Sequence, residues 1–576
     1  MPPSKRRKTS DAGQLTPGDA SSEVASVSVP APAPPGNLVC PISFNMFRDP
    51  VMVVESGHTY DRNEITQHFA HNNRDPKTNL PLRSTRVVTN WGVRDAVQEW
   101  LDRHPDVTPD GWDSRELLPA QVEAPVQTAE PGHGDALVLQ MWRDMCPELQ
   151  AIWWEVDRPV DQWRGVTMVD GRVVRLDLSR KSLSQVVPAC IGRLTALQAL
   201  NLEDNNLTSL PAEIGQLTVL RELYLRGNQL TSVPAEIGQL ASLEQLYLQG
   251  NQLTSVPAEI WQLTSLKDLS LSGNQLTSVP AEIGQLASLK SLYLGHNQLM
   301  SLPAEIGQLT SLKRLNLNDS QLTSVPAEIW QLTSLRELYL QRNQLTSVPA
   351  EIGQLTELKW LYLHSNKLTS VPAEIGQLAS LQLLNLSDNQ LTSVPAEIGQ
   401  LASLKSLYLG HNQLMSLPAE IGQLTSLKRL NLNDSQLTSV PAEIWQLTSL
   451  RELYLQRNQL TSVPAEIGQL TELKWLYLHS NKLTSVPAEI GQLASLQLLN
   501  LSDNQLTSLP AEIGQLTSLR ELILGKNQLT SVPAEIRQLT SLEKLYLEEH
   551  RLRTLPAAIG ELAVRGCEVV LMKADE

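Results

Sequence analysis

The chain has 576 residues, of which 41% are hydrophobic and 19% charged, and its formal net charge is -15. This composition is typical of a globular protein, and the excess of acidic side chains argues against a general nucleic-acid binder. Aromatic residues make up only 4% of the chain, so aliphatic side chains must form most of its core.

Residues 1–36 are rich in Pro, Ser and Ala, a composition that predicts a disordered tail. A short basic cluster lies within this tail. It fits a nuclear import signal and equally an ordinary solvated tail, and both interpretations stay open. The cluster consists of Lys5, Arg6, Arg7 and Lys8. Polar, proline-rich sequence follows it, and the chain has no stretch of about 18 apolar residues, so we expect neither a secretory signal nor a membrane span.

Residues 37–104 contain all three Phe residues of the chain. Turn and helix signals predict a small domain with an irregular loop, a hairpin around Glu55-Ser56-Gly57, a helix from about Asp61, a second loop and a final helix. Two zinc sites would need eight ligands, but the block offers one Cys and four His residues at no ligand-like spacing. The four cysteines of the chain lie far apart and include no C-x-x-C pair, so we expect neither a disulfide framework nor a zinc domain, and a reducing compartment. No metal and no cofactor are expected.

The order of residues in this block resembles the U-box family. The matching motifs are C-P-I-S (Cys40–Ser43), D-P-V (Asp49–Val51), G-x-T-Y-x-R (Gly57–Arg62), D-P-x-T-x-x-P-L (Asp75–Leu82) and Asn90 with the helix that follows it. The resemblance implies a small α+β domain in which salt bridges and hydrogen bonds replace zinc ions. It also implies that the domain docks a ubiquitin-conjugating enzyme charged with ubiquitin and forms no covalent ubiquitin intermediate. A homodimer through this domain stays open.

The resemblance assigns the docking residues by position. Ile42, Phe44 and Pro76 match the apolar positions that touch the conjugating enzyme. Asn79 lies where many relatives have an Arg that hydrogen-bonds both the enzyme and ubiquitin, and an amide can still bond but carries no charge. Ile42 and Phe44 also fit ordinary core residues. No side chain is expected to be catalytic, because such a ligase acts by holding the reactants in position.

Residues 105–135 have the composition of a linker. Residues 136–172 carry several Trp residues, among them Trp142, Trp154 and Trp163, and predict a helix and a β-ribbon that cap the end of a solenoid. At the other end, residues 557–576 are expected to form the C-terminal cap.

Residues 173–556 repeat the pattern L-x-x-L-x-L-x-x-N-x-L-T-S-V-P-A-E-I-G-Q-L every 23 residues, in about 17 units. The L-x-L alternation predicts a short strand and the Asn a turn, and V-P-A-E-I predicts a helical turn with Pro at its first position. One unit cannot bury its leucines alone, so the units must stack into an α/β solenoid. A parallel sheet of about 80 Å then lines its concave side, with the helical turns on the convex side.

These repeats resemble leucine-rich repeat proteins, and the form L-P-x-x-I-G-x-L is similar to that of the intracellular Ras-group repeats. The segment Asn274–Ser393 is identical to Asn389–Ser508, which indicates a tandem duplication of five units. A residue inside this block is therefore not expected to be a unique catalytic group. Ser320 and Ser435 replace the Asn of the pattern, and the loss of an amide donor predicts a local weak point in each unit.

The middle residue of x-L-x-L-x points to the concave side, where successive units form a column. Large aromatic side chains with a polar tip are typical of protein-binding surfaces, although aromatic residues in such a column also simply cover their cross-strand neighbours. The predicted substrate-binding residues of this column and its neighbour are Tyr224, Tyr247, Tyr293, Tyr339, Trp360, Tyr362, Tyr408, Tyr454, Trp475, Tyr477 and Tyr546.

The resemblances together imply a ubiquitin-protein ligase. Its U-box would dock the conjugating enzyme, and its repeats would bind an unknown protein whose lysine receives ubiquitin. We expect no nucleic acid among its partners and no membrane span in the chain. The expected location is the cytoplasm, and the basic cluster leaves a nuclear location open. The alternative is a non-catalytic leucine-rich repeat scaffold that binds a small GTPase or a receptor.

Overall fold

The chain forms two compact units, Met1–Thr128 and Ala129–Glu576, in a computed structural model. The basic cluster of the N-terminal tail lies outside the described residues. The structure describes residues 39–42, 47, 50–53, 58–82, 85, 87–89, 93, 97, 100–101, 103, 133–150, 154, 158–547 and 557–571.

The first unit contains a three-stranded antiparallel sheet and a helix packed on it. Strand β1 (Pro50–Val53) lies between β2 (Thr59–Asp61) and β3 (Val87–Thr89). Helix α1 (Arg62–Phe69) follows β2 directly and buries Ile65 against the sheet. The core of this unit is Cys40, Phe47, Val51, Val53, Tyr60, Ile65, Leu82, Val97, Trp100 and Leu101.

The second unit begins with a cap of two helices and a β-ribbon. Helices α3 (His133–Met145) and α4 (Pro147–Gln150) precede the short η2 (Val160–Gln162) and the antiparallel strands β4 (Val166–Val169) and β5 (Arg172–Asp177). The predicted helix and ribbon are thus present. Their contact surface is built from aromatic rings and one buried carboxylate.

Three Trp side chains fill this cap. The rings of Trp154 and Trp163 stack with centroids 4.9 Å apart, and Trp142 meets Trp154 edge-on at 6.3 Å. Asp135 is buried and accepts hydrogen bonds from the Arg172 side chain at 3.0 Å and from the Val173 N–H at 2.8 Å. Helix α3 is therefore held to the first strand of the repeat sheet by both packing and charge.

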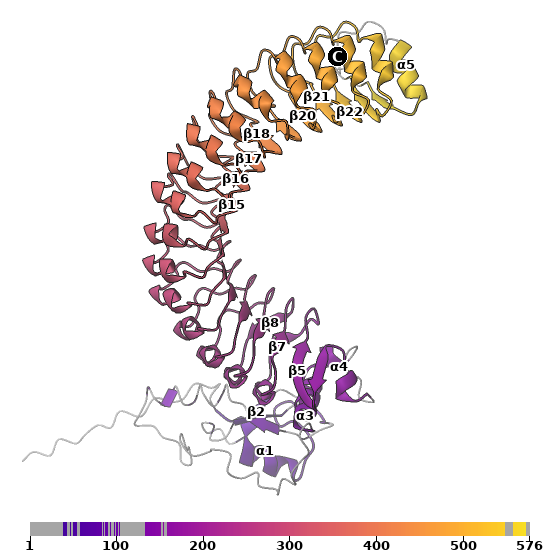
Figure 1. Cartoon of the computed structure of the whole chain (residues 1–576). Helices are drawn as coiled ribbons and strands as arrows, with labels where there is room; N and C mark the ends of the chain where they lie inside the picture. Colours follow the sequence, from indigo (N-terminus) through magenta and orange to yellow (C-terminus); the bar gives the residue numbers. More distant parts are fainter. Residues whose placement is uncertain are drawn as a thin grey trace, which may run out of the picture. The chain divides into compact units, whose positions relative to one another are not determined.

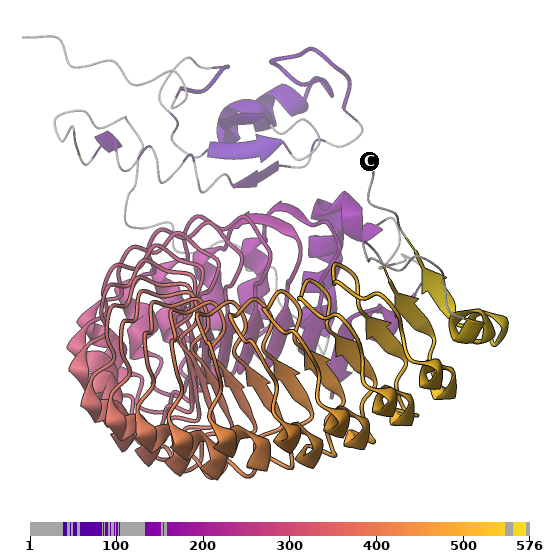
Figure 2. The ribbon, with the colours of Figure 1, turned by 90° about the horizontal axis from the view of Figure 1, so that it is seen from above.

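The repeats add one strand and one 3-10 helix every 23 residues. The strands are three residues long and run from β7 (Ala199–Asn201) through β9 (Glu222–Tyr224) to β23 (Lys544–Tyr546). The 3-10 helices run from η3 (Ala189–Arg193) to η18 (Ala534–Gln538). Figure 1 and Figure 2 show the strands along the inner side of the curved solenoid and the helices along its outer side.

Each strand pairs in parallel with the strand of the next repeat. The pairs stay in register, so that Leu223 lies opposite Leu246 and Tyr224 opposite Tyr247. This series begins at β5 and ends at β24 (Glu568–Val570), which pairs with β23 after helix α5 (Ala557–Val564). Two further short strands, β6 (Ser184–Val186) and β8 (Asn206–Ser209), form a small parallel sheet of their own.

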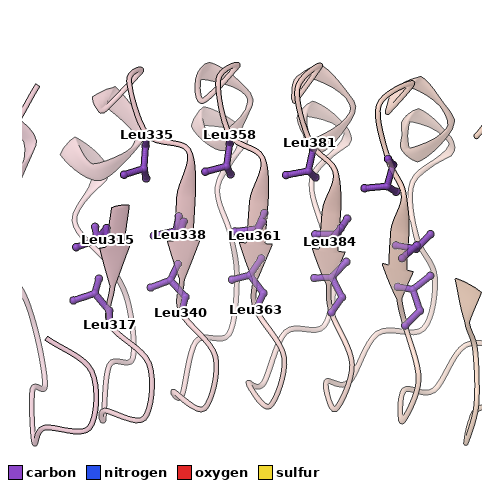
Figure 3. Close-up of a cluster of buried hydrophobic side chains, with 14 of the residues drawn as sticks. Leu315, Leu317, Leu335, Leu338, Leu340, Leu358, Leu361, Leu363, Leu381 and Leu384 are labelled. Atoms are coloured by element: carbon purple, nitrogen blue, oxygen red, sulfur yellow. The ribbon is translucent and has the colours of Figure 1, made fainter. Parts of the chain in front are cut away.

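The leucines of successive repeats form one continuous core, as Figure 3 shows for the units around Leu338. The strand leucines Leu338 and Leu340 are fully buried, as is Leu335 before the strand. At about 25 cal/mol per Å² of apolar surface removed from water, this stacking is the main stabilising contribution to a chain with so few long helices.

An asparagine in each regular repeat holds the turn after the strand. The Asn343 amide donates to the carbonyl groups of Leu317 at 2.8 Å and Leu340 at 3.0 Å, and its oxygen accepts from the Leu322 N–H at 3.1 Å. Because these bonds reach the preceding repeat, the asparagines form a hydrogen-bonded ladder through the solenoid. Among the described residues, the buried hydroxyl of Ser320 has no hydrogen-bond partner, and neither has that of Ser435.

The outer turn differs in one detail from the expectation. Pro234 lies directly before the 3-10 helix η5 (Ala235–Gln239) as its N-cap, where we had expected it at the first helical position, and its carbonyl accepts from the Ile237 N–H at 3.1 Å. In most repeats a glycine follows the isoleucine where neighbouring turns stack closely, although Trp261, Trp330 and Trp445 occupy this position in three of them. A Cβ on Gly215 would lie 2.6 Å from the carbonyl oxygen of Glu236.

Candidate functional site

In the first unit, the loop after α1 is organised around one buried carboxylate. Asp75 Oδ1 accepts from the N–H groups of Lys77 at 3.0 Å and Thr78 at 2.9 Å, and from the Thr78 hydroxyl at 3.1 Å. Its Oδ2 accepts from the Tyr60 hydroxyl at 3.1 Å and lies 3.2 Å from His58 Nδ1. The loop is thus tied to β2 by hydrogen bonds.

Tyr60 links the sheet to the same loop. Its hydroxyl is buried and accepts from the Lys77 N–H at 3.2 Å. Burial raises the pKa of Tyr60 far above its usual range, and the Asp75 carboxylate adds to this effect. The phenol therefore stays protonated and acts as a structural donor.

Asn79 occupies a turn position that requires a left-handed backbone. Its φ is 59°, a conformation that Asn and Gly adopt at less cost than other residues. Its N–H donates to the Asp75 carbonyl at 2.8 Å, and its own carbonyl accepts from the Arg74 side chain at 2.8 Å. The local backbone thus accounts for an asparagine here, and its side chain is exposed.

The predicted apolar docking residues are only partly described. Ile42 is half-buried and packs against the core of the first unit, Pro76 is half-buried, and Phe44 lies outside the described residues. Leu80 is 63% exposed, whereas Leu82 two residues later is buried. Sequence reasoning missed Leu80, although the alternation in Leu80-Pro81-Leu82 is a signal that the two leucines face opposite ways.

Cys40 is a structural residue. It is fully buried, and its sulfur accepts from the Asp61 N–H at 3.2 Å. No group of three or more His, Cys, Asp or Glu side chains in the described part of the chain is arranged to hold a metal ion.

In the second unit, the third residue of each three-residue strand lies in the predicted concave column, but the tyrosines do not make an unbroken row. They form three ring pairs: Tyr224 with Tyr247 at 5.1 Å, and two stacked pairs at 5.0 Å. Asparagine or serine separates most of the other tyrosines, and Ile523 precedes Tyr546. The stacked pairs are Tyr339 with Tyr362 and Tyr454 with Tyr477.

Each stacked pair belongs to a larger cluster. The Tyr339 hydroxyl donates to Glu337 at 3.1 Å, and the other oxygen of Glu337 accepts from Arg314 at 3.0 Å. Burial, with the Glu337 charge as the next cause, raises the pKa of Tyr339, so the phenol remains a neutral donor. Trp360 lies opposite Glu337 in the adjoining column and is 40% exposed.

The duplication repeats this cluster five strands later. Arg429 donates to Glu452 at 2.8 Å, and the hydroxyl of Tyr454 donates to Glu452 at 3.2 Å. Trp475 is 40% exposed, as its counterpart is. The concave surface therefore carries two copies of one cluster, each made of an Arg–Glu pair, a tyrosine hydroxyl and an exposed tryptophan. The two copies have the same orientation along the sheet.

A histidine follows the second tyrosine in each cluster. His364 meets the Tyr362 ring at 6.1 Å, and its counterpart His479 meets Tyr477 at 6.2 Å. Among the described residues, the buried Nδ1 atoms of both histidines have no hydrogen-bond partner. Burial lowers the pKa of both imidazoles, which are neutral at pH 7 as a result.

A shallow polar pocket of about 300 Å³ lies at the first strands of the sheet. Arg175 on its wall pairs with Glu222 at 2.9 Å. Tyr224, one of the predicted contact residues, also lines it, and its hydroxyl donates to Gln245 at 2.6 Å. The pocket thus forms the polar start of the concave surface.

Comparison with known proteins identifies both units. A leucine-rich repeat region model matches residues 171–274, 257–361, 347–463 and 457–563, which together cover more than half of the chain. The chain belongs to the leucine-rich repeat family. A U-box domain model matches residues 34–106, so a U-box precedes the repeats. The expected families and the expected fold class are confirmed.

Two plant proteins illustrate the U-box likeness. U-box domain-containing protein 19 of Arabidopsis thaliana is 49% identical over 65 residues, which are 11% of this chain and 9% of that protein. U-box domain-containing protein 56 of the same plant is 34% identical over 73 residues, 12% of this chain and 20% of that protein. The chain thus matches a fifth or less of the length of these two relatives.

Solved structures match the repeats. A leucine-rich repeat protein of Leptospira interrogans is 44% identical with a TM-score of 0.60, over 69% of this chain and 95% of that one. A plant peptide hormone receptor in complex with its ligand RGF2 is 32% identical with a TM-score of 0.56, over 69% of this chain and 74% of the receptor chain. Within the described residues, no helix has the length and apolar character of a membrane span.

Proposed function

We propose that this protein is a ubiquitin ligase whose U-box docks a charged ubiquitin-conjugating enzyme and whose repeats bind the protein to be modified. The observation that carries the proposal is the U-box with its second loop fixed by Asp75. A rigid loop presents Pro76, Asn79 and the exposed Leu80 as a docking edge at little entropic cost. Ile42 and Phe44 of the first loop complete the proposed contact.

Catalysis in this proposal is positional. The ligase holds the thioester of the conjugating enzyme near a substrate lysine, and the amine attacks without passing through the ligase. The cysteines support this route, since Cys40 and Cys567 are buried, and burial raises the pKa of Cys146 to about 11 and that of Cys190 above its usual value. A thiol that stays protonated is a poor acceptor for ubiquitin.

The second candidate is a non-catalytic scaffold in which the repeats bind a small GTPase or a receptor. Asn79 favours it, because an uncharged side chain replaces the Arg that many relatives use to contact both the enzyme and ubiquitin. The exposed Leu80 and the ordered loop favour the ligase instead.

An assay with ubiquitin, activating enzyme, a panel of conjugating enzymes and the full chain separates the two candidates. The ligase predicts polyubiquitin with the wild-type chain and at least a tenfold loss with Ile42→Ala or Leu80→Ala. Leu137→Ala is the matched control, because Leu137 is also exposed but lies in α3 of the repeat unit. If no conjugating enzyme gives polyubiquitin, the proposal of a ligase is wrong and the proposal of a non-catalytic scaffold is retained.

A further inference from the structure

The concave side carries a strip of positive charge that contrasts with the net charge of -15 for the whole chain. The residue two positions before the first strand leucine is basic in eight of nine successive repeats, from Lys290 to Lys474, with Gln382 as the exception. Over the same nine repeats, this column and the two concave columns beside it contain ten basic and two acidic residues.

The backbone explains why this basic column is open to solvent. The consecutive N–H groups of Lys313 and Arg314 both donate to the carbonyl of Lys290, at 2.8 and 3.0 Å. The same arrangement recurs in each repeat, and it breaks the alternation of the strand so that neighbouring side chains can both be exposed, as Lys313 and Arg314 are.

Most of these charges are not neutralised by the protein. Arg336 has a distant ion pair with Glu357 at 3.9 Å. Within the described residues, Lys290, Lys313 and Lys428 have no carboxylate at ion-pair distance. The two acidic residues of the strip, Glu337 and Glu452, are already bonded to Arg314 and Arg429.

An apolar element lies beside the charge and is present twice. Trp360 pairs across the sheet with Leu383, which is only half-buried, and Trp475 pairs in the same way with Leu498. At about 4.8 Å per strand, the two pairs lie about 24 Å apart. The two Trp–Leu pairs are related by translation along the sheet, because the duplicated units follow one another in the same chain direction. One extended segment that runs along the sheet can therefore contact both pairs in the same way.

We propose that this strip binds an extended acidic segment of a protein, with two apolar side chains about eight residues apart on the same face of the segment. An extended chain rises about 3.3 Å per residue, so the two Trp–Leu pairs are about seven to eight residues apart and about 12 residues cover the nine strands. Side chains on one face of an extended chain are separated by an even number of residues, which makes the spacing about eight. Carboxylates on this segment would pair with the basic column, and its apolar side chains would contact Trp360 and Trp475. The inference rests on the proposed function, since it states the class of substrate that the repeats select.

A single-stranded nucleic acid fits the same surface less well. It would bring a charge at every residue, including over the apolar pairs of Trp360 with Leu383 and Trp475 with Leu498. A peptide can place charge and apolar groups separately, as the strip requires.

The binding test uses the full chain without ubiquitin enzymes, so that its result is independent of ligase activity. The probe is a fluorescent 12-residue peptide of glutamates with leucine at its third and eleventh positions, which face the same side of an extended chain. Fluorescence anisotropy should show binding that weakens as sodium chloride rises. Moving the two leucines next to each other should weaken binding at least fivefold.

The variant Lys313→Glu with Lys428→Glu should weaken binding about tenfold or more. Its matched control is Lys367→Glu with Lys482→Glu, another pair related by the duplication, in which each lysine bonds only a neighbouring glutamine outside the strip. Circular dichroism verifies that both variants are folded.

Three results would overturn the inference. The first is that the glutamate peptide does not bind at low salt. The second is equal loss in the strip variant and the control. The third is that oligothymidylate of the same charge binds more tightly than the peptide, which would identify the strip as a nucleic-acid surface. Loss of ubiquitin transfer with intact peptide binding would refute the ligase alone.

Discussion

Replacing the two serines of the asparagine ladder by asparagine should stabilise the solenoid. A regular ladder residue such as Asn343 makes three buried hydrogen bonds at 2.8 to 3.1 Å. In the described structure, the buried hydroxyl of Ser320 makes none, and the same holds for Ser435. By register, an asparagine at position 320 would accept from the Leu299 N–H and donate to the carbonyls of Leu294 and Leu317.

The expected gain follows from these bonds. Three neutral hydrogen bonds contribute about 3 kcal/mol, and ordering the longer side chain costs about 1 kcal/mol. Each Ser→Asn change should therefore add about 2 kcal/mol to the free energy of local unfolding. This corresponds to about 30-fold slower amide exchange in the affected repeat.

Hydrogen exchange followed by mass spectrometry measures this effect on peptides that cover residues 299–320 and 414–435. The wild-type chain should exchange faster there than in the neighbouring repeats, and the Ser320→Asn, Ser435→Asn variant should not. The matched control is Ser324→Asn with Ser439→Asn, since these serines are exposed and duplicated in the same way. Unchanged exchange in the Ser320→Asn, Ser435→Asn variant would refute the reasoning. The three added hydrogen bonds would then contribute nothing to the free energy of local unfolding.

Three other outcomes are expected. Asn79→Arg should increase ubiquitin transfer severalfold by restoring a charged donor, at a stability cost of about 1 kcal/mol for a long side chain at positive φ; lower transfer from a folded variant would contradict this. Because burial lowers the pKa of His364 and His479, the unfolded chain takes up their protons first, so stability should decrease as pH falls below about 6.5. The melting temperature of a His→Gln double variant should therefore depend less on pH between 7 and 5, and an equal dependence would count against the effect. Trp360→Ala with Trp475→Ala should weaken binding of the acidic peptide at least tenfold and change the melting temperature little, and a large drop in melting temperature would mean that the indoles belong to the core.

The sequence predicted the repeat architecture closely because one 23-residue pattern specifies it many times. The leucine and asparagine positions determine which side chains are buried and which backbone groups they bond, as Leu338 and Asn343 illustrate. The unbonded hydroxyl of Ser320 also follows from the pattern. The 23-residue pattern predicts the tertiary structure here, because each unit contacts only the units next to it in sequence.

Other features required the folded chain. The left-handed backbone at Asn79 and the exposure of Leu80 depend on how the loop is tied to Asp75, a contact that joins residues far apart in sequence. The shared carbonyl that exposes both Lys313 and Arg314 is likewise a backbone detail. Strand alternation alone would have turned one of those two side chains inward.

The proposed docking residues and the concave contact residues remain predictions. Their geometry supports a docking edge at Pro76 and Leu80 and a pair of identical clusters on the sheet. The variants described above test whether these residues bind the conjugating enzyme and the acidic peptide. The U-box and the repeats can be probed separately, because each variant lies in only one of the two units.

The most direct test of the central claim is a single-turnover discharge measurement. A conjugating enzyme charged with ubiquitin is mixed with free lysine, with and without the full chain, and loss of the thioester is followed over time. The account predicts that the chain accelerates discharge at least tenfold, that Ile42→Ala removes the acceleration, and that no ubiquitin becomes thioester-linked to the chain. Discharge at the same rate with and without the chain for every conjugating enzyme, or ubiquitin trapped on one of its cysteines, would contradict it.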